Sequence, residues 1–587
     1  MGAERAVVTA PVPPLGRAAG DNGPMAQLPE SVPGGIGVPG SGPALESTAA
    51  LLAGYLRAAG VRHVYGYPGE SVIDFMEAAR HQGIEVVSAV REGTAAFMAE
   101  AAAMTSGRPG VCLSTLGPGS TAVLNGVASA HLDRVPVLFV SGQIETSREQ
   151  FFTHQVVDHD RLFAPVSKLA LRLEPASADT VIRRALRTAV AERPGAVHLT
   201  VPADAWPAAP GPAGLSSAAP GPAAGLVLPP LAPAAGSVDV YGDGDPARTL
   251  SAARRPVILA GIAALRCAAG PELVRLAEQA GLPVVVSPMA KGVFPEDHAY
   301  FAGVLDMAGH RVVWDLLAGA DLILAAGFDP VELISPWPVG TPVLHLDTTP
   351  NTDQVYASAH ELVGHVGAIL GWLCAQWRGQ PRWTEAELAA HRVRLRAAWL
   401  AGRAEGRLNP SDVVTIARDA APPGAIMATD VGSHKIMAGQ VWQAAEPRSV
   451  LIPNGLSAMG FGVPAAIAAR LTRPDRPVIA LVGDGGFAMA ATEMRIAAAL
   501  RLPVTVVVFA DGSLNRIELR QQMMGYPPTG TRMDGMDLVT LAEAMDCDGA
   551  RADSPAALEK ALAGLAARSR PLVIEARVDP AQYEAQF

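Results

Sequence analysis

Two aspartates that follow consecutive apolar strands are the clearest sign of chemistry in this sequence. Asp484 lies in the Gly-Asp-Gly-Gly run at 483–486, and Asp511 follows the next apolar strand. Residues 490–500 between them are typical of a helix, so both carboxylates are expected at one edge of a parallel sheet. Small residues let backbone N–H groups approach a phosphate, and two hard oxygen ligands beside it suit Mg²⁺. The alternative is a plain turn in which Asp484 caps a helix.

This pattern resembles the signature of the thiamine diphosphate (ThDP) enzymes, which is GDG followed one helix and one strand later by NN or ND. Here the pair is Ala510-Asp511, so its first position departs from the family. The resemblance implies that Mg²⁺ is bound by the side chains of Asp484 and Asp511 and by the backbone carbonyl of Ser513. It also implies that the neighbouring glycines contact the cofactor; these are Gly483, Gly485 and Gly486.

Two further segments of the C-terminal part resemble the acetolactate synthase branch of the same family. NGLSAMGFGVPAAIAA, at 454–469, is similar to the segment that holds the aminopyrimidine. There Met459 would bend the cofactor into its V shape, although core packing is the usual role of a methionine. The carbonyl of Ser457 would accept a hydrogen bond from the 4′-amino group, at a position where the branch usually has glycine. TDVGSHKIMAGQ, at 429–440, resembles the diphosphate-contacting loop and nominates Val431, Gly432, Ser433 and His434.

The N-terminal part supplies the remaining candidates. Residues 86–143 are similar to the pyrimidine-binding domain of this branch, and Glu92 falls on the glutamate that contacts N1′ of the aminopyrimidine. Local sequence alone would make Glu92 a solvated residue at a strand end. The loop 151–170 is similar to one that faces the active site, which nominates His154 and Gln155, with the turn at Gly117 nearby.

The elements that must position these residues alternate along the chain. Apolar strands separated by helices of ten or more residues predict βα units and parallel sheets. We predict three doubly wound parallel-sheet α/β domains: pyrimidine-binding (44–205), middle (237–378) and diphosphate-binding (379–587). The composition of residues 1–43 predicts a disordered tail, and the Pro- and Ala-rich stretch 206–236 predicts an extended linker.

Composition argues against several other classes of protein. The chain has 587 residues and a net charge of −10, without the basic stripe of a nucleic-acid-binding protein. Its four cysteines include no CxxC pair, which argues against a disulfide framework and a zinc cluster. No apolar run reaches the roughly 20 residues of a membrane span. We expect a cytoplasmic protein without nucleic-acid or membrane partners.

The resemblance implies ThDP- and Mg²⁺-dependent decarboxylation of a 2-oxo acid, with pyruvate as the expected donor. The resulting enamine would be ligated to a second carbonyl, giving 2-acetolactate or a related acyloin. Family members pair Glu92 of one chain with Asp484 of another, so a homodimer or homotetramer is expected. The stretch GFDPVEL, at 327–333, is closer to the FAD-independent catabolic type, so we expect no FAD.

Two alternatives stay open. One is a same-branch ThDP enzyme with another donor or acceptor: carboxyethylarginine synthase-like, an aldehyde lyase or a 2-oxo acid decarboxylase. Arg520 keeps it open, because an arginine there could hold an anionic acceptor; it could equally be a solvated helix charge. The other is a non-catalytic protein with the ThDP fold, against which the retained Glu92, Asp484 and Asp511 argue.

Overall fold

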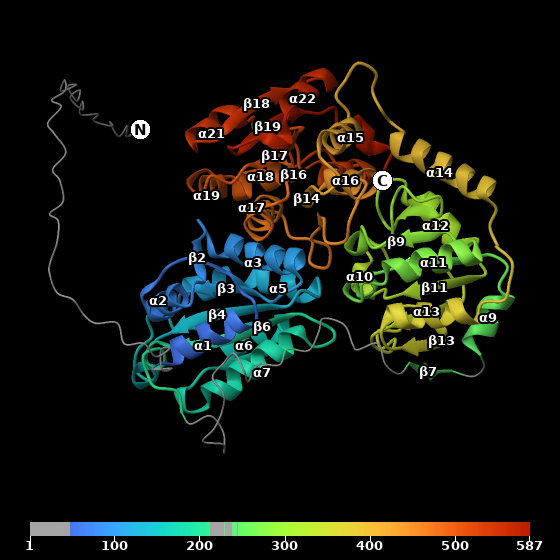
Figure 1. The fold of residues 1–587 in the computed structure, drawn as a ribbon. Coiled ribbons are helices and arrows are strands. Elements are labelled where there is room, and N and C mark those ends of the chain that lie inside the picture. Colours follow the sequence, from blue (N-terminus) through green and yellow to red (C-terminus); the bar gives the residue numbers. More distant parts are fainter. Residues whose placement is uncertain (1–46, 212–227, 229–237, 243–244, 534) are drawn as a thin grey trace, which may run out of the picture. The chain divides into compact units, whose positions relative to one another are not determined.

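Three separate sheets of mainly parallel strands organise the chain (Figure 1). The structure is a computed structural model, and it describes residues 47–211, 228, 238–242, 245–533 and 535–587. The predicted tail, 1–43, lies outside the described residues, as does most of the predicted linker. Each sheet is covered by helices on both faces, which confirms the predicted fold class of three doubly wound α/β domains.

The N-terminal sheet has the order β2-β1-β3-β4-β6-β5, and all its neighbouring strands are parallel. Helices α3 and α5 cover one face, and α1 and α7 cover the other (Figure 1). The strands are β1 (His63–Gly66), β2 (Glu85–Ser88), β3 (Gly110–Ser114), β4 (Val137–Gln143), β5 (Leu169–Arg172) and β6 (Ala196–Pro202). The helices are α1 (Thr48–Ala58), α2 (Ile73–His81), α3 (Glu92–Ser106), α4 (Pro118–Ala122), α5 (Leu124–Leu132), α6 (His159–Phe163) and α7 (Ala178–Val190).

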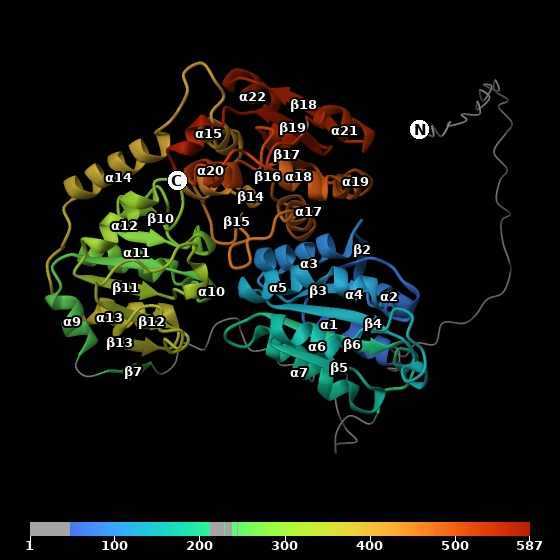
Figure 2. The same cartoon turned by 180° about the vertical axis from the view of Figure 1, so that it is seen from behind.

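The middle sheet has the order β10-β9-β8-β11-β12-β13-β7, in which only β7 runs antiparallel among the described strands. Helices α11 and α13 pack on one face, and α12 and α14 pack on the other (Figure 2). The strands are β7 (Asp239–Tyr241), β8 (Pro256–Ala260), β9 (Val284–Val286), β10 (Phe301–Val304), β11 (Leu322–Ala326), β12 (Val343–Asp347) and β13 (Ser358–Val363). The helices are α9 (Pro246–Ala252), α10 (Ile262–Arg266), α11 (Gly270–Ala280), α12 (His310–Ala318), α13 (Val366–Gln376) and α14 (Glu385–Leu400).

The C-terminal sheet has the order β15-β14-β16-β17-β19-β18, again with parallel neighbours. Its central strands are rich in valine and buried on both faces, as parallel strands between helices are. The strands are β14 (Ile426–Thr429), β15 (Val450–Leu451), β16 (Val478–Gly483), β17 (Val504–Ala510), β18 (Asp548–Ala552) and β19 (Leu572–Arg577). The helices are α15 (Pro410–Ala420), α16 (Ser433–Val441), α17 (Gly462–Thr472), α18 (Asp484–Ala490), α19 (Met494–Ala499), α20 (Asn515–Met523), α21 (Leu538–Ala544), α22 (Pro555–Leu562) and α23 (Ala581–Glu584).

Two details differ from the sequence-based expectations. Trp206, the first residue of the predicted linker, is buried and stacks on Phe75 with ring centroids 5.3 Å apart. We therefore place the start of the linker after Trp206. The segment predicted as one helix, 490–500, consists of the last residue of α18, a 3₁₀ turn at Ala491–Glu493 and the short helix α19.

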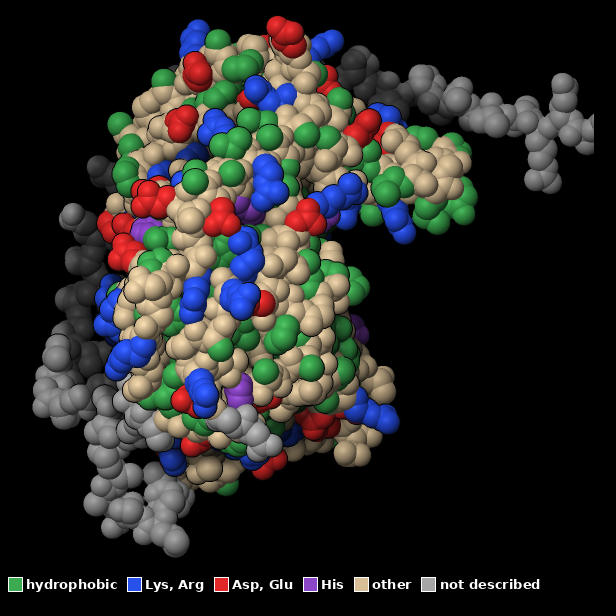
Figure 3. Space-filling view, turned by 90° about the vertical axis from the view of Figure 1, so that its right-hand side faces the viewer, with side chains coloured by type: hydrophobic (Ala, Val, Ile, Leu, Met, Phe, Trp, Pro, Cys, Tyr) green, Lys and Arg blue, Asp and Glu red, His purple; other side chains and the backbone are tan. Residues whose placement is uncertain are grey.

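The surface shows no segregation of charge on the face in Figure 3, where basic and acidic side chains are interspersed. Among the described helices, none combines the length and the apolarity needed to cross a membrane.

Candidate cofactor site

The two candidate metal ligands lie at the C-terminal ends of adjacent strands, as predicted. Asp484 follows β16 and Asp511 follows β17, two strands that pair in parallel. The backbone N–H of Gly512 donates to Asp484 Oδ2 at 2.8 Å, which joins the two turns. Asp511 Oδ1 accepts the backbone N–H of Ser513 at 3.1 Å. Both carboxylates line a cavity of about 300 Å³, and both also border a neighbouring cavity of about 530 Å³.

Burial makes this pair of carboxylates costly to ionise without a cation. It raises the pKa of Asp511 to about 7, and the nearby charge of Asp484 adds to that increase. Burial also raises the pKa of Asp484. No cluster of three metal-ligating His, Cys, Asp or Glu side chains occurs in the part of the chain that the structure describes. A cation here would therefore need further oxygen ligands, such as backbone carbonyls or a phosphate.

The same cavity gathers every nominated residue of the C-terminal domain. Besides the two aspartates and Ser513, its wall includes Val431, Gly432, Ser433, His434, Ser457, Met459, Gly483, Gly485 and Gly486. The sequence motifs that carry them lie after β14, before α17 and after β16 and β17. Strand ends thus bring together segments that are far apart in the sequence.

His434 has an unpaired nitrogen at the cavity. The residue is buried, and its ring lies beside two glycines: a Cβ on Gly432 or Gly483 would be about 3 Å from the ring. Burial lowers the pKa of His434 to about 3. Its Nε2 atom is buried and has no hydrogen-bond partner among the described residues. An unpaired imidazole nitrogen, a glycine-lined wall and two uncompensated carboxylates fit a diphosphate with its divalent cation.

Asp430 fixes the two loops that flank this wall. Its buried carboxylate accepts the backbone N–H of Val431 at 2.8 Å and that of Gly460 at 2.9 Å. A side chain at Gly486 would overlap the Asp430 carboxylate, so this position needs glycine. The loop before α16 and the loop before α17 are therefore held together by one side chain.

The nominated residues of the N-terminal domain gather elsewhere, and none of them lines this cavity. Glu92 is the first residue of α3, and a Cβ on Gly119 would lie 3.4 Å from its Oε1 atom. Gly117 has φ of 57° and packs against Gln155. A Cβ atom added to Gly117 would lie 2.7 Å from the Cβ of Gln155. His154 is exposed, with its ring 6.2 Å from that of Phe152.

Three family models match the chain in the order of its sheets. They are described as thiamine pyrophosphate enzyme, N-terminal TPP binding domain (46–162), central domain (245–373) and C-terminal TPP binding domain (430–576). A probable 2-ketoarginine decarboxylase of Pseudomonas aeruginosa is 31% identical over 85% of this chain and 87% of its own length. The chain belongs to the thiamine pyrophosphate enzymes. Thiamine pyrophosphate is the cofactor called thiamine diphosphate above.

Other members of the thiamine pyrophosphate enzyme family align over most of the chain. The catabolic acetolactate synthase of Raoultella terrigena is 29% identical over 90% of this chain and 94% of its own length. A Rhodococcus jostii thiamine diphosphate-dependent 4-hydroxybenzoylformate decarboxylase has the same fold, with a TM-score of 0.75 and 24% identity. That likeness covers 91% of this chain and 99% of the decarboxylase.

Sequence reasoning missed several cavity residues of this thiamine pyrophosphate enzyme. Lys435 could have been identified from the sequence, because it lies in the segment 429–440 that resembles the family. Arg516 lines the cavity, whereas Arg520, the arginine singled out from the sequence, is exposed and does not. Ile334 directly follows the stretch 327–333, and Tyr583 comes from a segment without a motif. The missed residues are Ile334, Lys435, Ile436, Phe509, Leu514, Asn515, Arg516, Ile517 and Tyr583.

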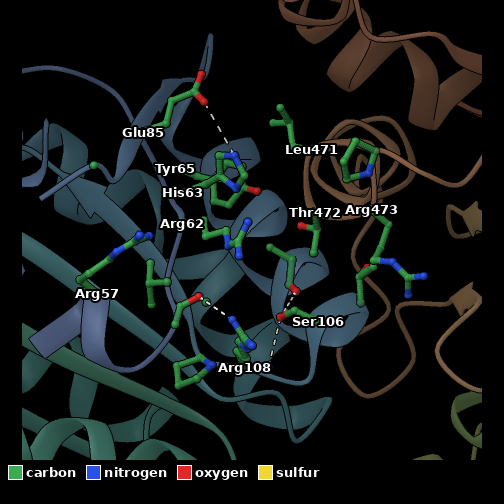
Figure 4. A pocket seen from close by; sticks show the side chains of 18 of the residues that line it. Arg57, Arg62, His63, Tyr65, Glu85, Ser106, Arg108, Leu471, Thr472 and Arg473 are labelled. Carbon is green, nitrogen blue, oxygen red and sulfur yellow. Dashed lines mark hydrogen bonds and ion pairs between the residues drawn. The ribbon is translucent and has the colours of Figure 1, made fainter. Parts of the chain in front are cut away.

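A second, larger cavity of about 760 Å³ is lined by arginines (Figure 4). Arg57 belongs to the last turn of α1, Arg108 follows the end of α3, and Arg473 follows the end of α17. Helix C-termini carry partial negative charge that arginines offset, so these side chains have a structural explanation. Arg108, for example, donates to the carbonyl of Gly60 at 3.3 Å. The arginines of this larger cavity therefore need no ligand to explain them.

Proposed function

We propose that the protein is a ThDP- and Mg²⁺-dependent enzyme that decarboxylates a 2-oxo acid and ligates the remaining fragment to a second carbonyl. Pyruvate is the proposed donor, and 2-acetolactate or a related acyloin is the proposed product. The observation that carries the proposal is the single cavity that joins Asp484, Asp511 and the unpaired His434. Among the relatives described above, the catabolic acetolactate synthase supports the ligation step.

In this proposal the side chains of Asp484 and Asp511 hold the metal, together with the carbonyl of Ser513. His434, Ser433 and the glycines hold the diphosphate. When bound, ThDP supplies the nucleophilic carbon and the electron sink for decarboxylation. The methyl group of Met459 reaches over the turn after β16, since a Cβ on Gly485 would lie 3.3 Å from its Cε atom. This position supports its proposed role as the apolar prop of the cofactor.

Glu92 is proposed to hold a proton at N1′ of the aminopyrimidine. Because Glu92 does not line the cavity of its own chain, we propose that it serves the cavity of a partner chain. A homodimer or homotetramer with sites shared between chains would meet this need. His154 and Gln155 would approach the substrate from the same partner.

We propose that the enzyme needs no FAD. In the middle domain the buried carboxylate of Glu332 accepts the backbone N–H of Ile262 at 3.0 Å and that of Asp329 at 2.9 Å, and it contacts the Ser287 hydroxyl. The turn between β8 and α10, where an open α/β sheet would offer N–H groups to a dinucleotide phosphate, is therefore filled by the chain itself. A flavin absorption band that survives desalting would contradict this proposal.

A second candidate is a 2-oxo acid decarboxylase that protonates the fragment instead of ligating it. The similarity to the probable 2-ketoarginine decarboxylase favours it. Product analysis separates the two. The protein is incubated with ThDP, Mg²⁺ and pyruvate, alone and with a panel of aldehydes and other 2-oxo acids, and products are identified by mass spectrometry. Acetolactate or a mixed acyloin supports the ligase, and an aldehyde alone supports the decarboxylase. No turnover of any oxo acid, despite bound ThDP, would favour a non-catalytic protein.

A further inference from the structure

Lys435 is a buried cation in the wall of the cofactor cavity. It lies in the first turn of α16, and only 3% of the residue's surface is exposed to solvent. Its Nζ atom donates to the carbonyl of Pro453 at 2.8 Å, to Asn454 Oδ1 at 3.1 Å and to Ser457 Oγ at 3.3 Å. An ammonium has three N–H donors, so these three acceptors use all of them. Lys435 therefore has no donor left for a substrate or a phosphate.

All three acceptors lie in one loop, residues 453–457, whose last member has an unusual backbone. Ser457 has φ of 54°, the left-handed region that favours glycine. Its hydroxyl donates to the carbonyl of Asn454 at 2.7 Å and accepts from Lys435. The side chain of Ser457 thus makes two hydrogen bonds that a glycine could not make. Both bonds depend on the left-handed backbone conformation of Ser457.

A carboxylate from the N-terminal domain holds the loop from its other side. Asp133, which follows α5, is fully buried and accepts the backbone N–H groups of Asn454 and Gly455. Asp133 and Asp430 are the negative groups whose charge favours the ammonium form of Lys435 against the cost of burial. The loop is therefore fixed between a cation of the C-terminal domain and an anion of the N-terminal domain.

We propose that Lys435 is a positioning residue, which holds Ser457 in the left-handed conformation that turns its carbonyl toward the aminopyrimidine. This inference rests on the proposed function, because it requires ThDP in this cavity. Lys435 acts through the loop and touches neither the substrate nor the reacting atoms.

The first test measures ThDP binding to the full-length protein by fluorescence titration with Mg²⁺ present. Lys435→Met removes three charge-assisted hydrogen bonds and leaves Asp133 without its cation, so the Kd for ThDP is expected to rise about 10- to 100-fold. Lys168→Met is the matched control, because Lys168 donates to a backbone carbonyl, that of Ala191, and does not line the cavity. It is expected to leave the Kd unchanged. An unchanged Kd in Lys435→Met would overturn the inference.

The second test asks whether Lys435 acts through Ser457. Ser457→Gly removes the cost of the left-handed backbone, so in that background Lys435→Met is expected to raise the Kd less than about threefold. Equal losses in the two backgrounds would show that Lys435 does not work through Ser457. If Lys435→Met gives no cooperative melting transition, Lys435→Gln replaces it, because the amide keeps two donors.

A third measurement needs no cofactor and separates the two proposals. Hydrogen exchange at the amides of Asn454 and Gly455 is expected to quicken at least tenfold in Lys435→Met, while exchange in β6 stays unchanged. Faster exchange together with no ThDP binding by the wild type would refute the proposed cofactor site but not the role of Lys435 in the loop. Unchanged exchange in a wild type that binds ThDP would refute only the role of Lys435.

Discussion

At the scale of single residues, the cavity is defined by two carboxylates without an ion-pair partner among the described residues and by one unpaired imidazole nitrogen. Asp484 and Asp511 are two half-buried acids side by side, and His434 keeps an unpaired nitrogen among the described residues. Each of these features costs free energy in the folded chain. Together they favour a ligand that is both anionic and metal-bound, which a purely structural cavity would not need.

Asp484→Ala is expected to abolish retention of ThDP and Mg²⁺. The change removes one of the two anionic ligands, and the diphosphate then loses its main counter-charge. ThDP titration by calorimetry at saturating Mg²⁺ checks this, with Asp475→Ala as the control because Asp475 is an exposed partner of Arg473. If the two variants bind ThDP equally well, the metal is bound elsewhere.

The sequence predicted the glycines and carboxylates of the site because their motifs are short and continuous. It could not predict Tyr583 or Ile334, which reach the cavity only through the packing of distant segments. It singled out Arg520 from a helix whose orientation was unknown. One turn earlier, Arg516 faces the cavity and stacks over the ring of Phe587 at 3.6 Å.

At the scale of elements, close approach of helices depends on small residues. Gly126 of α5 lies against α3, and a side chain there would overlap Cβ of Ala96. Gly126→Ala is therefore expected to lower the free energy of unfolding by about 1–3 kcal/mol. Chemical denaturation measures the change, and Gly340→Ala is the control because nothing lies within 4 Å of a side chain there. Equal stability of the two variants would mean that the helices separate without cost.

Two buried histidines, His159 of α6 and His198 of β6, predict a loss of stability in acid. Burial lowers the pKa of His159 to about 4 and also lowers the pKa of His198. Between pH 6.5 and pH 4 the unfolded chain therefore binds more protons than the folded chain, so the free energy of unfolding falls as the pH falls. His159 contributes at most about 3 kcal/mol to this change.

Denaturant titrations at pH 7.5 and pH 5 test this pH dependence. His159→Gln can still bond to the hydroxyl of Thr200, which lies 3.1 Å from Nδ1 of His159, but it cannot take up the proton. It is expected to lose less stability than the wild type between the two pH values. The same loss in both proteins would rule out His159 as the source.

The sheets themselves were predictable, since valine-rich runs and intervening helices alternate regularly. The boundaries around the cavity were not. The Gly-Asp-Gly-Gly run begins α18 at once because Gly486 sits against Asp430, a contact between segments more than 50 residues apart. Local periodicity contains no information about such a contact, so it predicted one helix at 490–500 where the chain forms the end of α18, a 3₁₀ turn at Ala491–Glu493 and α19.

At the scale of the whole molecule, the separation of Glu92 from the cavity leads to a test by subunit mixing. Glu92→Gln and Asp484→Ala are each expected to be nearly inactive alone; for Glu92→Gln the loss is roughly 10²–10⁴-fold in rate. If sites are shared between chains, a mixed dimer contains one site with both changes and one intact site. Co-refolded or co-expressed mixtures should then regain about a quarter of wild-type activity. Absence of any recovery, with mixed dimers present by mass spectrometry, would place each site within one chain.

The carboxylate of Asp430 accepts hydrogen bonds from the backbone N–H groups of Val431 and Gly460, so the chain itself holds the loops before α16 and α17 together. We therefore expect no rearrangement of these two loops before ThDP binds in the proposed site. Stopped-flow mixing of the metal-loaded protein with ThDP should accordingly show one exponential phase whose rate rises in proportion to the ThDP concentration. A plateau in that rate would instead reveal a slow opening step that limits cofactor uptake.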